Sequence, residues 1–329
     1  MFNFKDIYIN NWFSVVGPLE KNSKLKNYDI AMSDYYFNES TVEKAEIKMQ
    51  NVVLNYLTKS KTPNIIVGGD LSNQIVTTNM ALKDRNIPYL GLYSACATSG
   101  ESLITLASLI DSKKISEGIC ITSSHNLNAE KEFRFPIEYG APKPMRSTFT
   151  VTGAIGLYLS KTKSNIKIVN GTIGCVIDSY VKDVYNMGGV MALSAADTLI
   201  RHLNLTKTKI EDYDLVVTGD LGLVGEKIFR EILKQKNTKL KNYVDAGTLI
   251  YNNIKYSGGS GPVTLPLVFF NNIVHNKKYK KIIYIATGSL HSPVLVNQKN
   301  TIPAISHALT IEVERWQLYI HFYFVALFV

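Results

Sequence analysis

Hydrophobic and polar positions along the chain alternate in blocks that predict strands followed by helices. Residues 38–60 are expected to form a helix, which opens with a capping box made by Ser40 and Glu43. A second helix is indicated by apolar residues at helical spacing, namely Leu103, Leu106, Ala107 and Ile110. The short apolar runs expected to be strands are 64–68, 89–93 and 118–122. This alternation is typical of an α/β fold with a mainly parallel sheet covered by helices.

The chain also contains an internal repeat. Gly68-Gly69-Asp70-Leu71 and Thr218-Gly219-Asp220-Leu221 each follow an apolar run and are offset by 150 residues. Two further pairs of segments match in the same order, 94–98 with 244–248 and 119–123 with 283–287. The last pair is offset by 164 residues, so about fourteen extra residues are expected in or beside 251–261. The repeat predicts two similar α/β halves, 1–165 and 166–315.

The last segment, 316–329, reads WQLYIHFYFVALFV and contains no Asp, Glu, Lys or Arg. It is too short to span a bilayer alone. Three interpretations stay open, namely a buried last strand or helix, a segment that touches a membrane, and an abnormal end of the reading frame.

The composition is that of a globular protein, because 46% of the 329 residues are hydrophobic and 19% are charged. The net charge of +9 should favour anions or an acidic membrane surface, although part of it falls in Asn/Ile/Lys-rich stretches. Cys96, Cys120 and Cys175 lack the spacing of a disulfide framework or a zinc ribbon and suit a reducing compartment. No signal peptide and no membrane-spanning run are expected.

Cys96 is the strongest candidate for a reactive residue. It lies between an apolar strand and an amphipathic helix, within SACATSGES. A helix N-terminus at this place would stabilise a thiolate and lower the pKa of the thiol, as an acyl-accepting cysteine requires. The alternative is a small buried cysteine with no chemical role.

Two neighbouring segments offer groups for an anion. His125 follows the strand 118–122, where ligands collect in α/β sheets, although a lone histidine is more often structural. The segment 130–146 contains three prolines, so it is expected to be an ordered loop that either faces an anion or is solvated. Its basic residues are Lys131, Arg134, Lys143 and Arg146.

The segment 257–261, which reads SGGSG, would either hold an anion on backbone N–H groups or form a tight turn. It has neither the Lys-Ser/Thr of a P-loop nor the spacing of a dinucleotide fingerprint, so no nucleotide cofactor is expected. No cluster of His, Cys, Asp and Glu has metal-ligand spacing, and no nucleic-acid-binding motif is present. Neither a metal nor a nucleic acid is therefore expected.

The longer motifs resemble those of the stage V sporulation protein AD family. The most specific is TSSHNLNAEKEFRFPIEYGAPKP, at 122–144. The others are GGDLSNQIVTTN, DYDLVVTGDLGLVG, MGGVMALSAADT and IATGSLHSPVLVNQKNTIPAISHA. The resemblance covers about residues 16–314, and the apolar segment beyond Glu314 is not part of the usual pattern.

The resemblance implies the thiolase-like fold, in which two duplicated α/β halves stack as alternating helix and sheet layers. It implies a non-enzymatic protein of sporulation that binds dipicolinic acid, or its calcium chelate, and works with membrane proteins of an uptake channel. The protein would lie on the inner membrane of the developing spore as a peripheral component. A homodimer is expected, because thiolase-like relatives are commonly dimers.

The resemblance extends to catalytic relatives, the initiating ketoacyl synthases, which use a cysteine, a histidine and an asparagine. Cys96 matches the cysteine, but the places of the histidine and the asparagine resemble Thr218-Gly219-Asp220 and Gly258-Gly259-Ser260-Gly261. Without an imidazole, the cysteine lacks its general base. This departure implies a degenerate enzyme with Cys96 as a vestigial nucleophile position, unless His125 or His291 substitutes. An active acyltransferase that uses Cys96 is the alternative.

Dipicolinate is a flat aromatic dianion, so its pocket should combine N–H donors, cations and an apolar wall. A calcium chelate would instead prefer oxygen ligands such as Asp70, Asp220 or Glu138. Because Asp70 and Asp220 are equivalent in the repeat, a shared capping role is the favoured interpretation for both. The expected ligand-binding residues are Cys96, His125, Arg134, Lys143, Asp70, Asp220, Gly258 and Gly259.

Overall fold

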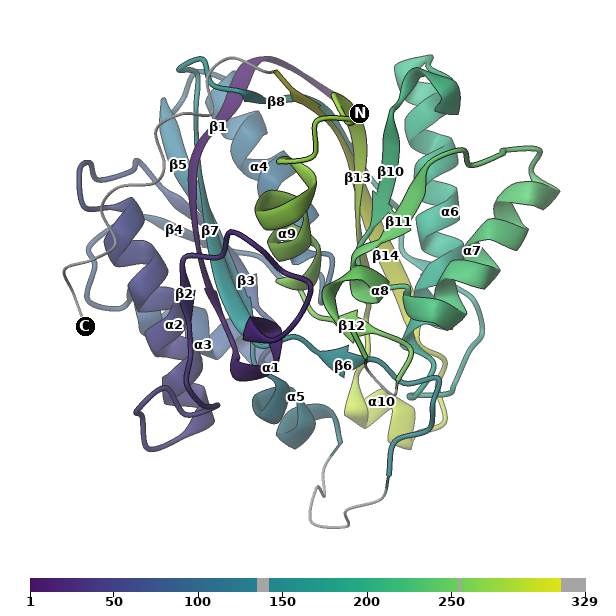
Figure 1. Cartoon of the computed structure of the whole chain (residues 1–329), viewed down its shortest axis with the longest axis horizontal. Helices are drawn as coiled ribbons and strands as arrows, with labels where there is room; N and C mark the ends of the chain where they lie inside the picture. Colours follow the sequence, from purple (N-terminus) through teal and green to yellow (C-terminus); the bar gives the residue numbers. More distant parts are fainter. Residues whose placement is uncertain (135–141, 254–255, 315–329) are drawn as a thin grey trace.

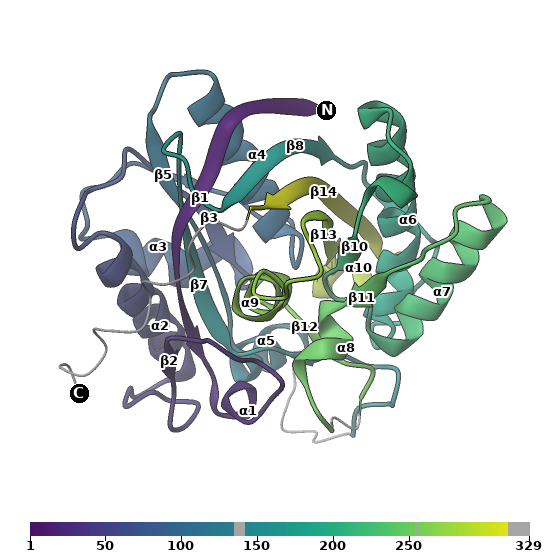
Figure 2. The same ribbon diagram turned by 45° about the horizontal axis from the view of Figure 1, so that its top comes forward.

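The computed structural model describes residues 1–134, 142–253 and 256–314 of the chain. Helices and sheets alternate across the molecule in five layers (Figure 1). The central layer holds α4 (Thr98–Asp111) and α9 (Thr264–Val268), which lie between the two sheets in both views (Figure 1 and Figure 2). The expected α/β architecture of alternating layers is confirmed.

The outer face of each sheet is covered by a pair of helices. The first sheet carries α2 (Val42–Leu57) and α3 (Val76–Leu82). The second sheet carries α6 (Met187–Thr206) and α7 (Gly222–Gln235). Apolar side chains on the inner side of these helices pack toward the sheets. Three separate apolar clusters result, one between the sheets and one beneath each helix pair.

The strands of the first sheet, in spatial order, are β4 (Tyr89–Gly91), β3 (Ile66–Asp70), β5 (Glu117–Ser124), β7 (Gly153–Ser160) and β1 (Phe2–Val16). The pairings of β3 with β4 and β5 are parallel. Those of β7 with β5 and β1 are antiparallel. The expectation of a mainly parallel sheet is therefore wrong, because two of these four pairings are antiparallel.

The second sheet repeats this order with β11 (Tyr243–Asp245), β10 (Leu215–Thr218), β13 (Lys281–Ser289), β14 (Pro303–Val313) and β8 (Ile166–Ile173). Its pairings are again parallel among the first three strands and antiparallel for the last two. β1 and β8 pair antiparallel and join the two sheets into one continuous path. The duplication predicted from the sequence is confirmed as a repeat of strand order and strand direction.

The predicted capping box of α2 is wrong, whereas the predicted place of the extra residues of the second half agrees with the structure. The N-cap of α2 is Thr41, whose hydroxyl accepts the backbone N–H of Lys44, whereas the Ser40 hydroxyl accepts the side chain of Lys44. In the second half, the counterpart of α4 is interrupted, because residues 251–263 separate α8 (Ala246–Ile250) from α9. The extra residues of the second half lie in this interruption.

The remaining elements are short. The segment 316–329 lies outside the described residues, and no helix within the described ranges is both long and apolar enough to cross a bilayer. The short elements are α1 (Pro18–Lys21), β2 (Ile30–Ala31), α5 (Asn126–Phe133), β6 (Phe149–Thr150), β9 (Ile177–Asp178), β12 (Gly259–Ser260), the π-helix Phe269–Ile273 and α10 (Pro293–Asn297).

Candidate ligand site at the strand ends

A cavity of about 800 Å³ opens at the edge where β3 and β13 end, and both halves of the chain line it. The first half contributes the turn that holds Cys96 and one side of α5. The second half contributes the start of α6 and most of α10. Strand ends gather ligands in α/β proteins because the loops that follow parallel strands converge there. The cavity is therefore the principal candidate site within the described residues.

Cys96 is presented to the cavity by a tight turn. Ala95 has a positive φ of 49°, a conformation that costs a non-glycine residue about 1–2 kcal/mol. The hydroxyl of Thr98 accepts the N–H of Ser94 at 3.0 Å and donates to the carbonyl of Ala95 at 2.7 Å, which fixes the turn. Gly288 of β13 lies under it, since a Cβ there would be only 2.2 Å from the Ser94 carbonyl oxygen. Residues from two distant segments, 94–98 and Gly288 of β13, therefore hold this one turn.

The surroundings of Cys96 disfavour a thiolate. Burial raises the pKa of its thiol well above the ordinary value, and the carboxylate of Asp220 raises it further. The backbone N–H of Gly261 opposes this shift without cancelling it. The backbone N–H of Cys96 itself, two positions before the first residue of α4, also opposes the shift, but burial is the larger cause. The prediction of a low thiol pKa is therefore wrong.

Asp220 lies where β10 ends, and it is 1% exposed. Neither carboxylate oxygen has a hydrogen-bond partner of ordinary geometry among the described residues. Burial and the neighbouring carboxylate of Asp245 raise its pKa well above the usual range, against a smaller opposite influence of Thr264 and the Gly261 N–H. An upward shift of this kind favours the protonated carboxyl, which can donate a hydrogen bond.

Arg134 and Lys143 line the cavity and share one acidic partner, Glu130. Arg134 Nη1 lies 2.8 Å from a Glu130 oxygen, and Lys143 Nζ forms an ion pair with the other oxygen. The guanidinium of Arg134 also lies 5.8 Å from the ring centre of Tyr185, and Lys143 Nζ lies 5.6 Å from that of Phe149. Two cations therefore lie at the wall of the cavity, and the ring of Tyr185 lines the cavity beside Arg134.

His291 reaches the same cavity from the loop after β13. Its ring centre lies 5.4 Å from that of Phe133. Both ring nitrogens are buried and lack a hydrogen-bond partner in the described part of the chain. Burial lowers the pKa of the imidazole, so the neutral ring dominates at neutral pH.

A sequence model of the stage V sporulation protein AD family matches residues 2–312, nearly the whole chain. The chain belongs to this family. It is also 36% identical over 319 residues to the stage V sporulation protein AD of Bacillus subtilis strain 168, which covers 93% of this chain and 94% of that protein. The resemblance expected from the motifs is confirmed, and with it a role in sporulation.

Solved structures of condensing enzymes share the fold. A variant of OleA from Xanthomonas campestris has a TM-score of 0.60 at 10% identity and covers 93% of this chain and 99% of that one. The 3-oxoacyl-[acyl-carrier-protein] synthase III of Aquifex aeolicus has a TM-score of 0.52 at 13% identity. It covers 92% of this chain and 99% of its own. At these identities the likeness shows the thiolase-like fold alone, which confirms the expected fold class.

The structure brings together some of the predicted site residues of this family member. Cys96, Arg134 and Lys143 line the cavity, and Asp220 lies close enough to Cys96 to raise its pKa. His125 lies elsewhere, because its Nε2 is 2.7 Å from the Tyr35 carbonyl oxygen and it does not line the cavity. Glu138, named as an oxygen ligand for calcium, lies outside the described residues.

Asp70 is part of the scaffold. Its two oxygens accept the N–H of Ser72 and both the N–H and the hydroxyl of Thr78, at 2.7–2.8 Å. The capping role expected for both equivalent aspartates therefore holds for Asp70 but is wrong for Asp220. In the second half, Asp245 takes over this role, and it accepts the N–H groups of Leu221, Gly222 and Thr248.

Gly258 and Gly259 serve packing rather than an anion. Gly258 has a φ of 137°, and a Cβ there would lie 2.7 Å from the Gly247 carbonyl oxygen. Gly259 belongs to β12, which pairs with β6 across the two halves. It is Gly261, two residues on, whose N–H influences both Cys96 and Asp220.

Sequence reasoning missed Glu130, Tyr185 and the cavity position of His291. The spacing of four residues between Glu130 and Arg134 on a helix was a usable signal for their ion pair. Nothing in the local sequence indicated that Tyr185, from the other half, would lie against Arg134. Contacts between distant segments of this kind depend on the tertiary fold.

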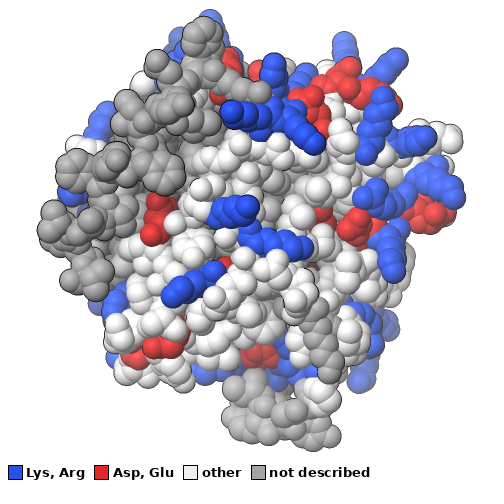
Figure 3. All heavy atoms as spheres, in the orientation of Figure 1, with Lys and Arg blue, Asp and Glu red and all other residues white. Residues whose placement is uncertain are grey.

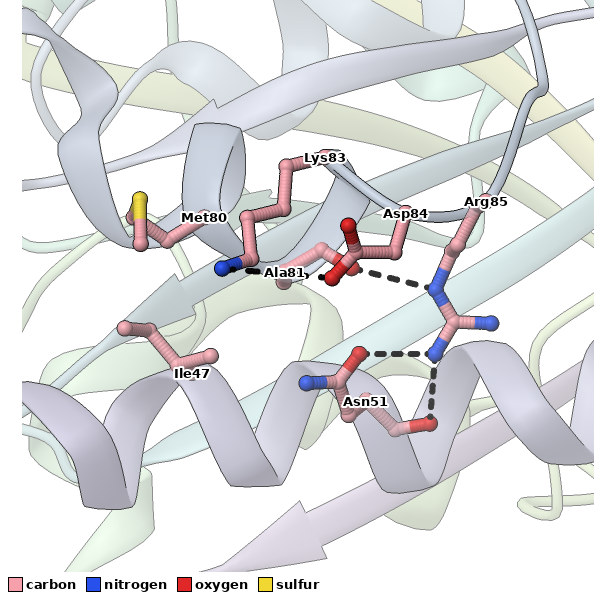
Figure 4. A pocket seen from close by; sticks show the side chains of 7 residues that line it. All are labelled: Ile47, Asn51, Met80, Ala81, Lys83, Asp84 and Arg85. Atoms are coloured by element: carbon pink, nitrogen blue, oxygen red, sulfur yellow. Dashed lines mark hydrogen bonds and ion pairs between the residues drawn. The ribbon is translucent and has the colours of Figure 1, made fainter.

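A second hollow, of about 440 Å³, lies on the outer helices α2 and α3. Figure 4 shows that Arg85 is engaged there, donating to the carbonyl of Ala81 and to Asn51. Asn55 accepts from the same guanidinium at 2.8 Å. Because this half-buried guanidinium is held by the helices themselves, we assign the hollow a structural role.

Proposed function

We propose that this protein binds dipicolinate non-covalently in the cavity beside Cys96 during sporulation. The observation that carries the proposal is the wall on which Arg134 and Lys143 lie, with the aromatic ring of Tyr185 beside Arg134. Cations suit the carboxylates of the ligand, and the Tyr185 ring suits its flat face. The raised pKa of Cys96 supports binding over covalent chemistry.

The charges that line the cavity also bear on the form of the ligand. Arg134 and Lys143 are balanced there by Glu130 and Glu132. A dianion would have to compete with Glu130 for both cations. A calcium ion held by the ligand could take Glu130 or Glu132 as an oxygen ligand while the cations stay near the ligand's carboxylates, so we propose that calcium dipicolinate binds at least as tightly as the free acid.

Calorimetric titration of the full chain with dipicolinate, with and without calcium, tests this function. We expect saturable binding that survives Cys96→Ala and weakens about tenfold or more in Arg134→Ala and in Lys143→Ala. Arg146→Ala is the matched control, because Arg146 belongs to the same basic segment but pairs with Asp183 outside the cavity. Affinity lost equally in Arg146→Ala, or no saturable binding at all, would contradict the proposal.

The alternative function, an acyltransferase that uses Cys96, can be tested on the same protein samples. Incubation with an acyl-CoA followed by peptide mass spectrometry would reveal an acyl group on Cys96. The raised pKa of this thiol argues against it, and Asp220 raises that pKa further instead of activating the thiol. Stoichiometric acylation that disappears in Cys96→Ala would favour the enzyme and overturn our choice.

We further propose that the protein acts at the inner membrane of the developing spore, together with membrane proteins of an uptake channel, and that it forms a homodimer. The outer strand β4 supports the dimer, because its edge is unpaired within the described chain and its Leu90 is 40% exposed. Sedimentation equilibrium of the wild type and of Leu90→Lys would test the dimer.

A further inference from the structure

The charge of the molecule is concentrated on one edge of the fold. Seven connections lead into strands that start at this edge. In chain order they are 58–65, 83–88, 112–116, 161–165, 207–214, 236–242 and 274–280, and they lead into β3, β4, β5, β8, β10, β11 and β13. Together they hold fifteen lysines and one arginine against four acidic residues, a net charge of +12. The whole chain carries only +9, so all other residues together are slightly acidic.

The strand register places these connections on the same edge, which we call the lysine edge. In the first sheet, Ile66 pairs with Ile119, and Glu117 with Ser160, so the starts of β3 and β5 meet the end of β7. The second sheet follows the same rule through its parallel strands β10, β11 and β13. Within that sheet the end of β14 pairs with the start of β8, at Val313 and Ile166, so the connection before β8 lies on this edge too. The cavity lies at the opposite edge, where the strands end.

The side chains of the lysine edge are available to a partner. Fourteen of the sixteen basic residues are exposed. Figure 3, in the orientation of Figure 1, shows Lys and Arg gathered along the upper and right-hand margins of the molecule. Within the described ranges, four of the sixteen form ion pairs, namely Lys61 with Glu117, Lys83 with Asp84, Lys161 with Asp111 and Lys163 with Glu314.

We propose that the lysine edge docks the protein on an anionic lipid bilayer. Lysines are compact charges on flexible stems, and they are spread over a broad face rather than arranged along a groove. Nucleic-acid surfaces of comparable charge add arginine forks or stacking aromatic rings, and the seven connections contain one arginine, which is already engaged by helix carbonyls. A bilayer therefore fits this surface better than a nucleic acid.

A second observation favours a lipid surface. The last described residue, Glu314, lies at the lysine edge, because it follows the end of β14 and pairs with Lys163. The sequence that continues from this point, 316–329, is apolar and uncharged. A basic surface and an apolar segment at the same edge of a protein together bind an anionic membrane more tightly than either does alone. The inference rests on the proposed membrane location but not on the identity of the ligand.

The test compares two full-length variants of equal net charge in vesicle co-sedimentation. One reverses four lysines of the lysine edge, as Lys59→Glu, Lys114→Glu, Lys277→Glu and Lys278→Glu. The matched control reverses four exposed lysines near the strand-end edge, as Lys21→Glu, Lys44→Glu, Lys182→Glu and Lys227→Glu. Both changes lower the formal net charge from +9 to +1. The vesicles are phosphatidylcholine alone or with roughly 30 mol% phosphatidylglycerol.

We expect the wild type to bind the anionic vesicles and to be released as NaCl rises from about 0.1 M to about 0.5 M. The lysine-edge variant should lose at least about tenfold in binding, and the control less than about threefold. Equal losses in the two variants, equal binding to neutral vesicles, or no binding by the wild type would each overturn the proposal.

Two further measurements keep the test clear. Circular dichroism checks that both variants are folded, and a Lys→Gln version of the lysine-edge variant replaces the Glu version if that one is not. Dipicolinate titration of the same samples separates the two proposals, because the lysine edge and the cavity lie at opposite ends of the strands. Lost vesicle binding with retained ligand binding, or the reverse, identifies which proposal has failed.

Discussion

Asp70 and Asp220 occupy equivalent places at the ends of β3 and β10, but their surroundings are opposite. Asp70 accepts three hydrogen bonds that shape the following turn. Asp220 is equally buried, has no such partners among the described residues, and lies near Cys96. The second half has moved the capping role to Asp245 on the neighbouring strand. A duplicated scaffold can thus keep one copy of a residue for folding and free the other for a site.

The largest expected effect comes from a matched pair of isosteric changes, Asp70→Asn and Asp220→Asn, which tests this comparison directly. The first replaces an acceptor by an NH₂ group that faces N–H donors, so we expect a loss of roughly 3 kcal/mol in the free energy of unfolding. The second removes a buried, unpaired carboxyl and should change it by less than about 1 kcal/mol, or even raise it. Urea unfolding of both variants measures the difference. Similar losses in the two variants would show that the aspartates are equivalent after all.

A second test uses the buried carboxyl of the first half, Glu46, which burial and Asp70 give a pKa of about 8. In the unfolded chain this group has an ordinary pKa of 4.5, so it releases its proton at lower pH when unfolded. The free energy of unfolding should therefore fall as pH rises from about 4.5 to about 8, by roughly 2 kcal/mol or more.

Glu46→Gln should flatten this slope, which unfolding at a series of pH values would measure. Some slope should remain, because burial also raises the pKa of Glu20 and of Asp245 to about 7. A Gln variant whose slope matches that of the wild type would show that Glu46 is not held protonated in the folded protein.

The smallest expected effect is a difference in the labelling rates of the Cys96 and Cys175 thiols. At pH 8, iodoacetamide should label Cys96 at least about tenfold more slowly than Cys175, because the thiol pKa of Cys96 is raised whereas Cys175 is exposed. Asp220→Asn should speed labelling of Cys96 by roughly threefold, since burial remains as the larger cause. Peptide mass spectrometry measures all sites in one sample. Rapid labelling of Cys96 in the wild type would restore the hypothesis of an activated nucleophile.

The sequence predicted the fold well because its signals are local or repeated. The apolar stripe from Leu103 to Ile110 is fully buried in α4, and the matching Gly-Asp turns lie at equivalent strand ends. The antiparallel returns of β7 and β14 were missed, because a buried strand of either direction has the same apolar pattern.

The candidate site was harder to predict from sequence. Cys96 was identified because the turn before a helix is a local feature. The state of its thiol was predicted wrongly, because burial and the approach of Asp220 come from the tertiary fold. His125 is held at its Nε2 by the carbonyl of Tyr35, ninety residues earlier in the chain, and no local signal indicates this contact.

The pairing of β1 with both β7 and β8 has a consequence for the order of synthesis. Residues 2–16 leave the ribosome first, yet one side of this strand is completed only when Ile166–Ile173 has followed. Until then Ile7 and Ile9 stand on an open strand edge, where a second nascent chain could pair. The edge of the first half that its own strands leave open is therefore protected only after the second half has begun to follow.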